Sequence, residues 1–266
     1  MKFSIITVNF NNCKGLQRTI DSVLAQTSND REFIVIDGGS TDGSKELLEK
    51  YDAQIDYWVS EPDRGIYNGM NKGIAQAKGE FVNFMNSGDT FFDTKTLEQV
   101  GLIMDGSDIV VGSDYNEDPA TGKSAITILP LRISFATFFT QTFPHQSSFI
   151  RRNLFDSSPY DESLTIVADW KFFLDKVVGE GRSVQLVDFP ISRREQDGIS
   201  NSQVQKTMQE RQHVLDELLP PGIRRDYDSL SQLDRSTMYK LLNLCDKGKA
   251  RKPLTYIIKV LHLLYK

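Results

Sequence analysis

Cysteine is scarce in this chain of 266 residues, which has only Cys13 and Cys245, far apart in the sequence. Two such distant residues have no metal-ligand spacing and make no disulfide framework. The sequence therefore predicts neither a zinc site nor a disulfide-stabilised fold. A reducing compartment, the cytoplasm, is the location that we expect.

Long apolar segments are missing too. No run of about 18 apolar residues occurs, which is the length that a membrane-spanning helix requires. The apolar run from Phe3 to Val8 is too short for a signal peptide. We therefore expect neither a transmembrane helix nor a secretory leader.

Acidic residues outnumber basic ones, 36 to 31, which gives a formal net charge of −5. This balance gives no reason to expect nucleic acid as a partner, although a phosphate-containing ligand needs only local positive groups. Two nucleotide-binding signatures are also missing: the phosphate loop GxxxxGKS/T, and the dinucleotide fingerprint GxGxxG after the first expected strand.

The sequence does contain an alternation of strand-like and helix-like segments. Helical patterns follow each of the first four expected strands, and the strands are at 3–8, 33–36, 56–60, 80–85 and 108–112. Strands that alternate with helices of about ten residues predict an α/β fold with a mostly parallel sheet and helices on both faces.

The pattern changes after Tyr115. We expect a hairpin strand at 124–129, a helix after 168, a strand at 183–189 and a polar loop at 192–201, with helical patterns from there to the end. These changes divide the chain near residues 113 and 200.

Four of the expected strands are followed by polar residues: Asn9, Asp37, Asp63 and Asp89. In a parallel sheet these ends meet at one edge, where ligands bind. Asp89 follows an apolar strand and is a candidate ligand for Mg²⁺ or Mn²⁺, which prefer carboxylate and phosphate oxygens. The alternative is that each residue caps a helix or closes a turn.

Nearby residues could contact a nucleotide. Asp37 could accept a hydrogen bond from a base or a ribose hydroxyl. Arg64 and Lys72 are candidates to meet a diphosphate, the arginine because its planar fork matches phosphate oxygens. For Lys72, a solvated position on a helix is the alternative.

Six motifs follow one another along the chain: SIITVN at 4–9, DGGSTDG at 37–43, EPDRGIY at 61–67, NSGD at 86–89, HQS at 145–147 and ADW at 168–170. In this order they resemble the family 2 glycosyltransferases. The resemblance covers about residues 3–200. It implies an inverting enzyme with the GT-A fold that uses a nucleotide-activated sugar, most similar to bacterial enzymes that build capsule, exopolysaccharide or O-antigen repeats.

The resemblance also implies a division of labour and a set of partners. Residues 1–113 would be the nucleotide-sugar-binding half of a GT-A domain, 114–200 the acceptor half, and 201–266 a helical C-terminal region. The donor would be a nucleoside-diphosphate sugar, with uridine the expected nucleoside. The acceptor would be a saccharide, which could be lipid-linked.

Site roles follow from the same resemblance. The donor would be bound by Thr7, Asn9, Asp37, Asp63, Arg64, Lys72, Ser87, His145 and Arg193. His145 could contact the acceptor or the diphosphate, with a structural hydrogen bond as the alternative. Arg193 lies in the expected polar loop at 192–201, which could close over the donor.

Two carboxylates would carry the chemistry. Asp89 occupies the place of the metal-binding acidic motif, where Asn86 and Gly88 replace the usual acidic residues. Asp169 matches the catalytic base, in a motif reduced from the usual acidic pair to Ala168-Asp169. The alternative for Asp169 is a helix N-cap.

The end of the chain has a basic amphipathic pattern. Apolar residues including Leu254, Ile257 and Leu261 share one helical face after a lysine- and arginine-rich segment. Such a helix could lie in a membrane interface, which would place the enzyme at the inner face of the cytoplasmic membrane. Packing on its own domain or on a second subunit is the alternative.

Two other functions fit parts of the sequence. A sugar nucleotidyltransferase also pairs an α/β sheet with a metal, but it would need a glycine-rich basic loop where Asn9-Phe10-Asn11-Asn12 stands. A degenerate glycosyltransferase that binds saccharide or acts as a scaffold would explain the reduced acidic motif at 86–89.

Overall fold

The computed structural model describes residues 1–117, 124–130, 132–194 and 203–231. The chain divides into two compact units, Met1–Val214 and Leu215–Lys266. In the second unit, Arg224 binds Asp216 at 3.1 Å and Asp228 at 2.6 Å. The amphipathic segment expected after residue 247 lies outside the described residues.

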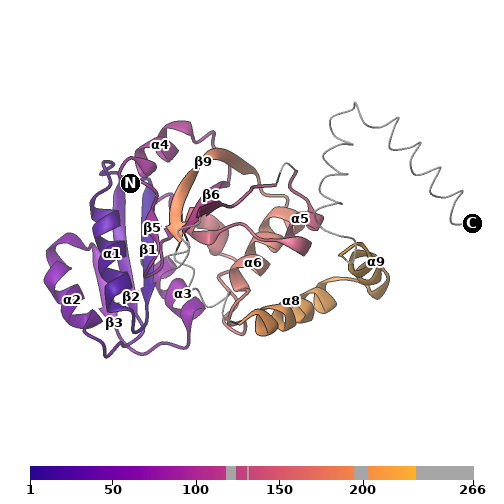
Figure 1. The fold of residues 1–266 in the computed structure, drawn as a ribbon, viewed down its shortest axis with the longest axis horizontal. Coiled ribbons are helices and arrows are strands. Elements are labelled where there is room, and N and C mark those ends of the chain that lie inside the picture. The colour runs from indigo at the N-terminus through magenta and orange to yellow at the C-terminus, as the bar shows by residue number, and fades with distance from the viewer. Residues whose placement is uncertain (118–123, 131, 195–202, 232–266) are drawn as a thin grey trace, which may run out of the picture. The chain divides into compact units, whose positions relative to one another are not determined.

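The first unit is built on a sheet that has nine strands among the described residues, in the order β3-β2-β1-β4-β8-β6-β9-β5 with β7 paired to β6 (Figure 1). Strands β1 to β4 run parallel, and β8 runs antiparallel to both its neighbours. The bounds are β1 Phe3–Asn9, β2 Arg31–Asp37, β3 Tyr57–Ser60, β4 Phe81–Phe84, β5 Thr90–Phe91, β6 Ile109–Glu117, β7 Ser124–Ile126, β8 Ser148–Arg151 and β9 Val184–Arg194. The predicted α/β class with a largely parallel sheet is confirmed.

Helices join these strands at the expected places. Their bounds are α1 Cys13–Leu24, α2 Ser44–Tyr51, α3 Ile66–Gln76, α4 Thr96–Ile103, α5 Phe135–Thr140, α6 Ala168–Phe173, α8 Val204–Leu218 and α9 Pro221–Ser231. The side chain of Asn12 caps α1 by accepting from Gly15 N at 3.1 Å, as its position before the apolar pattern predicts. No helix in the described ranges combines the length and the apolar character needed to cross a membrane.

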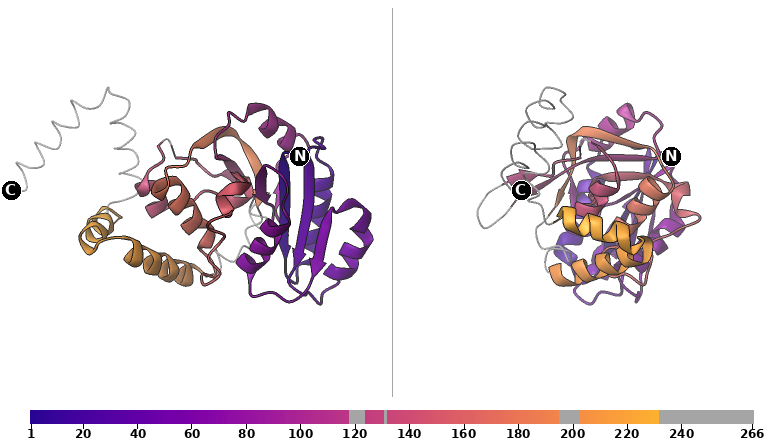
Figure 2. Two further views of the ribbon diagram at one scale, coloured as in Figure 1. Left: turned by 180° about the vertical axis from the view of Figure 1, so that it is seen from behind. Right: turned by 90° about the vertical axis from the view of Figure 1, so that its right-hand side faces the viewer.

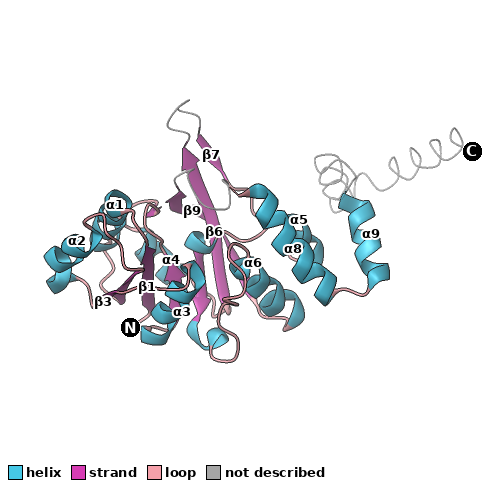
Figure 3. Ribbon diagram, turned by 90° about the horizontal axis from the view of Figure 1, so that it is seen from below, coloured by secondary structure: helices cyan, strands magenta, loops and turns pink. Residues whose placement is uncertain are grey.

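The two faces of the parallel half are covered by different helices. Helices α1 and α2 lie on one side of β1, and α3 lies on the other (Figure 3). Side chains of β1 alternate accordingly: Ile5 belongs to the core cluster with Leu16 and Ile20 of α1, whereas Ile6 meets Gly73 of α3. Because β1 is buried on both faces, its sequence does not alternate between apolar and exposed polar residues.

The later part of the first unit packs α5 and α6 beside β6 and β9 (Figures 1 and 2). Its core is aromatic, with Phe155 stacked on Phe172 at 4.5 Å between ring centroids. The indole of Trp170 donates to Phe138 O at 2.6 Å, which ties α6 to α5. Buried tryptophans need such a partner for their N–H group.

Two strands were not predicted, and a third is longer than expected. Strand β5 has only two residues and β8 has four, too few to give a periodic pattern. The expected polar loop at 192–201 begins inside β9, which pairs with β6 up to Arg194 across register shifts near Ser113. That part of the loop prediction is wrong, because irregular pairing lets polar residues continue the strand.

The contact between α3 and β1 can be tested by two glycine substitutions. A Cβ atom on Gly73 would lie 2.4 Å from Ile6 Cγ2, whereas one on Gly101 of α4 would lie 3.8 Å from Phe3. We expect Gly73→Ala to lower the free energy of unfolding by about 1–2 kcal/mol, because overpacking outweighs the gain in helix propensity. Gly101→Ala should keep or raise it. Urea denaturation measures both, and a Gly73→Ala protein as stable as the wild type would contradict this packing.

Candidate active site

The ends of β1, β2 and β3 lie side by side, with Asn9 opposite Asp37 and Asp37 opposite Ser60. Asp37 is fully buried and accepts from Asn9 Nδ2 at 2.7 Å, from Ser60 Oγ at 2.6 Å, and from both the amide and the hydroxyl of Ser40. Burial alone would raise the pKa of Asp37, but these hydrogen bonds lower it, so the group stays ionised. A carboxylate has about four acceptor directions. The four protein donors occupy those of Asp37, which therefore organises the loop after β2.

Asp63 packs against that loop. A Cβ atom on Gly38 would lie 2.8 Å from Asp63 Oδ2, so this close approach requires glycine. Gly65 N donates to Asp63 Oδ1 at 2.9 Å and closes the turn before α3. Phe10 lies next to Gly38 and is 65% exposed. The edge formed by Asn9 and Asp63 therefore also carries an exposed aromatic ring, that of Phe10, which the sequence did not indicate as a site residue.

Three side chains donate hydrogen bonds to backbone carbonyl oxygens of the turn after β4, Asn86 to Asp89, and of Met85 just before it. The donors are Thr7 Oγ1 to Met85 O at 2.7 Å, Thr19 Oγ1 to Asp89 O at 2.7 Å and Asn12 Nδ2 to Ser87 O at 3.1 Å. Thr7 is buried, so the structure places it beneath the edge, where its hydroxyl supports the turn. Ser87 and Asp89 are half-buried at the turn itself.

The conformation of this turn bears on its reduced acidic motif. Gly88 has a φ of +108°, a value that an L-residue with a side chain rarely adopts. An aspartate at position 88 would be strained. The backbone thus explains one of the two departures from the family pattern.

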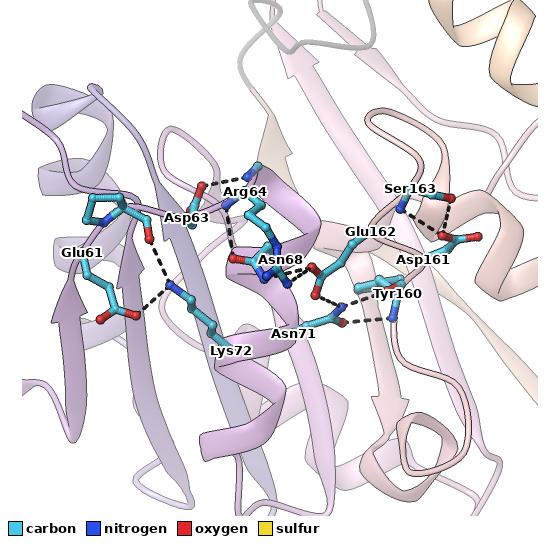
Figure 4. Close-up of polar contacts among 12 residues, drawn as sticks. Glu61, Asp63, Arg64, Asn68, Asn71, Lys72, Tyr160, Asp161, Glu162 and Ser163 are labelled. Carbon is cyan, nitrogen blue, oxygen red and sulfur yellow. Dashed lines mark hydrogen bonds and ion pairs between the residues drawn. The ribbon is translucent and has the colours of Figure 1, made fainter.

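Arg64 and Lys72 face carboxylates (Figure 4). Arg64 Nη2 lies 2.6 Å from Glu162 Oε2, and Lys72 Nζ lies 2.7 Å from Glu61 Oε1. The Arg64 side chain is 78% exposed, and such surface pairs contribute only about 0–1 kcal/mol. Both cations can therefore exchange partners at little cost.

Glu162 also joins the two halves of the first unit. Asn68 and Asn71 of α3 donate to its carboxylate at 2.9 and 3.0 Å. Asn71 in addition binds the backbone of Tyr160 through both its amide atoms, at 2.9 and 3.0 Å. Helix α3 is thereby connected to the segment that precedes α6.

The structure brings Asp169 and His145 together. His145 Nδ1 lies 3.0 Å from Asp169 Oδ2, and Tyr67 of α3 donates to Asp169 Oδ1 at 2.9 Å. On its other side, His145 Nε2 lies 3.3 Å from Asn86 Nδ2. One imidazole ring thus separates the Asp169 carboxylate from the turn at Asn86.

Charges around the ring set its protonation. Burial alone would lower the pKa of His145, but Asp169 and then Asp89 raise it above its usual value, against the opposing effect of Arg194. Burial would raise the pKa of Asp169, but bonds from His145 and Tyr67 lower it. Both groups therefore favour the ion pair.

The amide of Asn86 can serve either state of the ring. As oriented, its Nδ2 donates to a neutral Nε2, and its Oδ1 is a buried atom without a partner in the described part of the protein. Rotation of the amide would present Oδ1 to a protonated Nε2–H. The same residue then accommodates a change of charge on His145.

Asp169 lies in the first turn of α6 but is not its N-cap, which is Val167. The alternative given by the sequence is therefore wrong. Asp169 is 9% exposed, and its carboxylate bonds to His145 and Tyr67.

The two arginines at the end of β9 point to different neighbours, as alternation along a strand requires. Arg193 lies over the rings of Phe92 and Tyr115 at 4.5 and 4.9 Å. Arg194 instead pairs with buried Asp114 at 3.1 Å and influences His145 electrostatically. Arg194 is thus the arginine whose charge acts on the imidazole, and the rest of the expected loop lies outside the described residues.

A divalent cation would find one carboxylate at the turn after β4, that of Asp89. No group of three histidine, cysteine or acidic side chains suited to a metal occurs in the described ranges. Asp89 is half-buried at this turn, as is Ser87. This fits Mg²⁺ or Mn²⁺ in the form that keeps waters and substrate phosphates as its other ligands.

The model of the family described as "Glycosyl transferase family 2" matches residues 4–166. The chain belongs to this family. It is 38% identical over 176 residues to an uncharacterized glycosyltransferase of Mycobacterium tuberculosis, which covers 64% of this chain and 67% of that protein. It is 28% identical over 179 residues, with the same coverage, to a PGL/p-HBAD biosynthesis glycosyltransferase of Mycobacterium bovis.

Solved structures with the same fold include two from distant organisms. The S. aureus TarS fragment 1–349 in complex with UDP-GlcNAc gives a TM-score of 0.62 at 20% identity, covering 76% of this chain and 61% of that one. The mannosyltransferase PcManGT of Pyrobaculum calidifontis, in complex with GDP-Man and Mn²⁺, gives 0.63 at 14% identity, covering 99% and 80%. The chain spans only 37% of the longer TarS chain.

The pair of His145 and Asp169 can be tested by titration. We expect NMR to give His145 a pKa above 6.5, and Asp169→Asn to bring it below 6.5, because burial then outweighs the remaining attraction. The His145 signal is assigned by its absence from His145→Gln.

Stability should follow the same pair. The stabilisation from the raised pKa of His145 is present at low pH and lost as the pH rises through that pKa, whereas the part from Asp169 is lost as the pH falls through its lowered pKa. The advantage of wild type over His145→Gln in urea should therefore be largest between about pH 4 and 6.5. A difference that does not vary with pH would contradict the pairing.

Proposed function

We propose that this family 2 member is an inverting glycosyltransferase that transfers a sugar from a nucleoside-diphosphate sugar to a saccharide acceptor. One observation carries the proposal: a carboxylate of the acceptor half, Asp169, lies one imidazole ring from the turn of the donor half that ends in Asp89. A base and a diphosphate-binding edge at this separation suit an attack on a carbon held between them.

Uridine diphosphate is the first donor to test. TarS has been solved with UDP and UDP-GlcNAc, and PcManGT with GDP-Man and Mn²⁺. These complexes support a nucleotide-sugar donor, and the present edge supplies groups for one. Phe10 would stack on the base, and Asn9, Asp63 and Ser87 would line the nucleotide, above the framework formed by Asp37 and Thr7.

The diphosphate would draw cations toward itself. Arg64 would exchange Glu162 for phosphate oxygens, and Lys72 would exchange Glu61, both from weak surface pairs. Arg194 and His145 would meet the diphosphate from the acceptor side, whereas Arg193 would hold the end of β9 against Phe92 and Tyr115.

Asp169 would act as the base. As the acceptor oxygen forms its bond to the anomeric carbon, the bond from that carbon to the diphosphate oxygen breaks on the opposite face, and the hydroxyl proton passes to Asp169. Tyr67 and His145 each bond to one of its oxygens, which leaves an acceptor direction open on each. His145 and Tyr67 would fix its orientation, and proton removal of this kind contributes about 10²–10⁴-fold to a rate.

A divalent cation held by Asp89 would supply charge neutralisation on the leaving diphosphate. The acceptor could be lipid-linked in surface polysaccharide biosynthesis. The basic amphipathic sequence after residue 247 supports contact with the inner face of the cytoplasmic membrane, or with a second subunit.

The two carboxylates make separable contributions. Asp169→Asn should reduce sugar transfer by about 10²–10⁴-fold while UDP binding by calorimetry stays within about twofold of the wild type. Asp89→Asn should remove the Mn²⁺-dependent part of UDP binding. The exposed Asp188→Asn is the matched control.

Other outcomes point elsewhere. Full transfer by Asp169→Asn would remove it as the base, and UDP binding that ignores Mn²⁺ would remove Asp89 as a metal ligand. Pyrophosphate release from a nucleoside triphosphate would favour a nucleotidyltransferase, and donor binding without turnover would favour a scaffold.

Phe10 provides a test of the nucleotide position. Base stacking on an aromatic side chain is worth about 1–3 kcal/mol, so Phe10→Ala should weaken UDP binding by about 5- to 100-fold. Leu102→Ala removes a side chain that is 80% exposed on α4 and should leave binding unchanged. Unchanged binding in Phe10→Ala would move the base away from this ring.

A further inference from the structure

Helix α8 reaches the segment that carries Asp169. Glu210 of α8 accepts hydrogen bonds from three successive backbone amides, Thr165 N at 3.0 Å, Ile166 N at 2.9 Å and Val167 N at 3.3 Å, as well as from the Thr165 hydroxyl. A carboxylate held by several amide donors is a strong, charge-assisted contact. The three amides lie directly before α6. The N-cap residue of this helix, Val167, has no side chain able to accept a hydrogen bond from the helix end.

The contact continues from Glu210 to Asp169 through one peptide unit. In the peptide unit between Ile166 and Val167, the Val167 amide donates to Glu210 Oε2 at 3.3 Å and the Ile166 carbonyl accepts from Tyr67 Oη at 2.6 Å. The same Tyr67 hydroxyl lies 2.9 Å from Asp169 Oδ1, so its single proton is shared between the two acceptors. Displacement of this peptide would therefore move the hydroxyl that orients the carboxylate.

The next residue of α8 holds the other side of the same turn. Arg211 lies over the ring of Trp170 at 4.8 Å and donates to Gln141 O at 3.3 Å. Trp170 follows Asp169 in the chain and is buried. Helix α8 thus contacts the residues on both sides of Asp169.

We propose that Glu210 is a positioning residue that fixes Asp169 against His145. This inference rests on the proposed role of Asp169 as the base, and it extends the catalytic unit into a helix that the sequence pattern assigns to the C-terminal region. Glu210 touches neither donor nor acceptor; it acts through the backbone of 165–167.

The orientation of Asp169 can be read without a substrate, from the NMR titration of His145. The fall in the pKa of His145 in Asp169→Asn gives the full effect of losing the carboxylate. Glu210→Gln keeps the side-chain volume but turns an NH2 donor toward a donor amide, so it should produce at least a third of that fall. Gln209→Ala, an exposed neighbour on α8, should produce none.

Two further measurements separate positioning from general loss of structure. Calorimetry with UDP should give Glu210→Gln an affinity within twofold of the wild type, and donor hydrolysis or transfer should fall about 10-fold in kcat with little change in KM. If Glu210→Gln does not fold, Thr165→Ala removes one of the four bonds and should shift His145 in the same direction by less.

An unchanged pKa of His145 in a folded Glu210→Gln protein, or in Thr165→Ala where that is used, would overturn the proposal. A tenfold loss of UDP affinity would also overturn it, since the effect would then reach the donor half. Full transfer by Asp169→Asn would refute the proposed base instead, and the titration would still decide whether Glu210 positions Asp169.

Discussion

The buried charge of Asp169 is the constraint on which the candidate site depends. An ionised carboxylate with so little exposure is costly unless donors surround it. Tyr67 and His145 supply those donors at 2.9 and 3.0 Å. They come from α3 and from the 3₁₀ turn before β8, so one charged group fixes three elements that are distant in the sequence.

The supports of these two donors extend the constraint outward. Asn83 in β4 is fully buried and donates to Gln146 O and Ser148 O, both at 3.0 Å, which holds the turn that carries His145. Burial and the nearby Asp169 raise the pKa of Tyr67 well above its usual value, so its hydroxyl stays protonated and remains a donor. The groups that support the two donors, Asn83 and the Tyr67 hydroxyl itself, therefore do not change charge near neutral pH.

The sequence could predict the parallel half and the edge at which its polar residues gather, because buried strands and amphipathic helices leave periodic patterns. It could not predict that His145 contacts Asp169. The two lie on separate motifs, and their contact requires the short antiparallel β8, whose four residues carry no period. Likewise the partner of Arg64 is 98 residues away, and no local pattern indicates it.

For a related reason, the sequence could not show that Arg193 and Arg194 have different neighbours. A loop gives no alternation, so either arginine could face a ligand. Once β9 is seen to extend through both, the pleat sends them to opposite sides. One residue of register therefore decides that Arg193 makes an exposed contact with aromatic rings, whereas the charge of Arg194 acts on His145.

The reduced acidic motif follows from the same balance of charge. The turn requires glycine at position 88, where φ is +108°. At position 86, an aspartate would be a third carboxylate around one imidazole that already responds to Asp169 and Asp89. Like charges so close would raise the pKa of at least one of these acids. The amide of Asn86 avoids that repulsion and can donate to a neutral ring or accept from a protonated one. One half-buried carboxylate at the turn and one buried carboxylate beside the imidazole are thus what this turn and this histidine together allow.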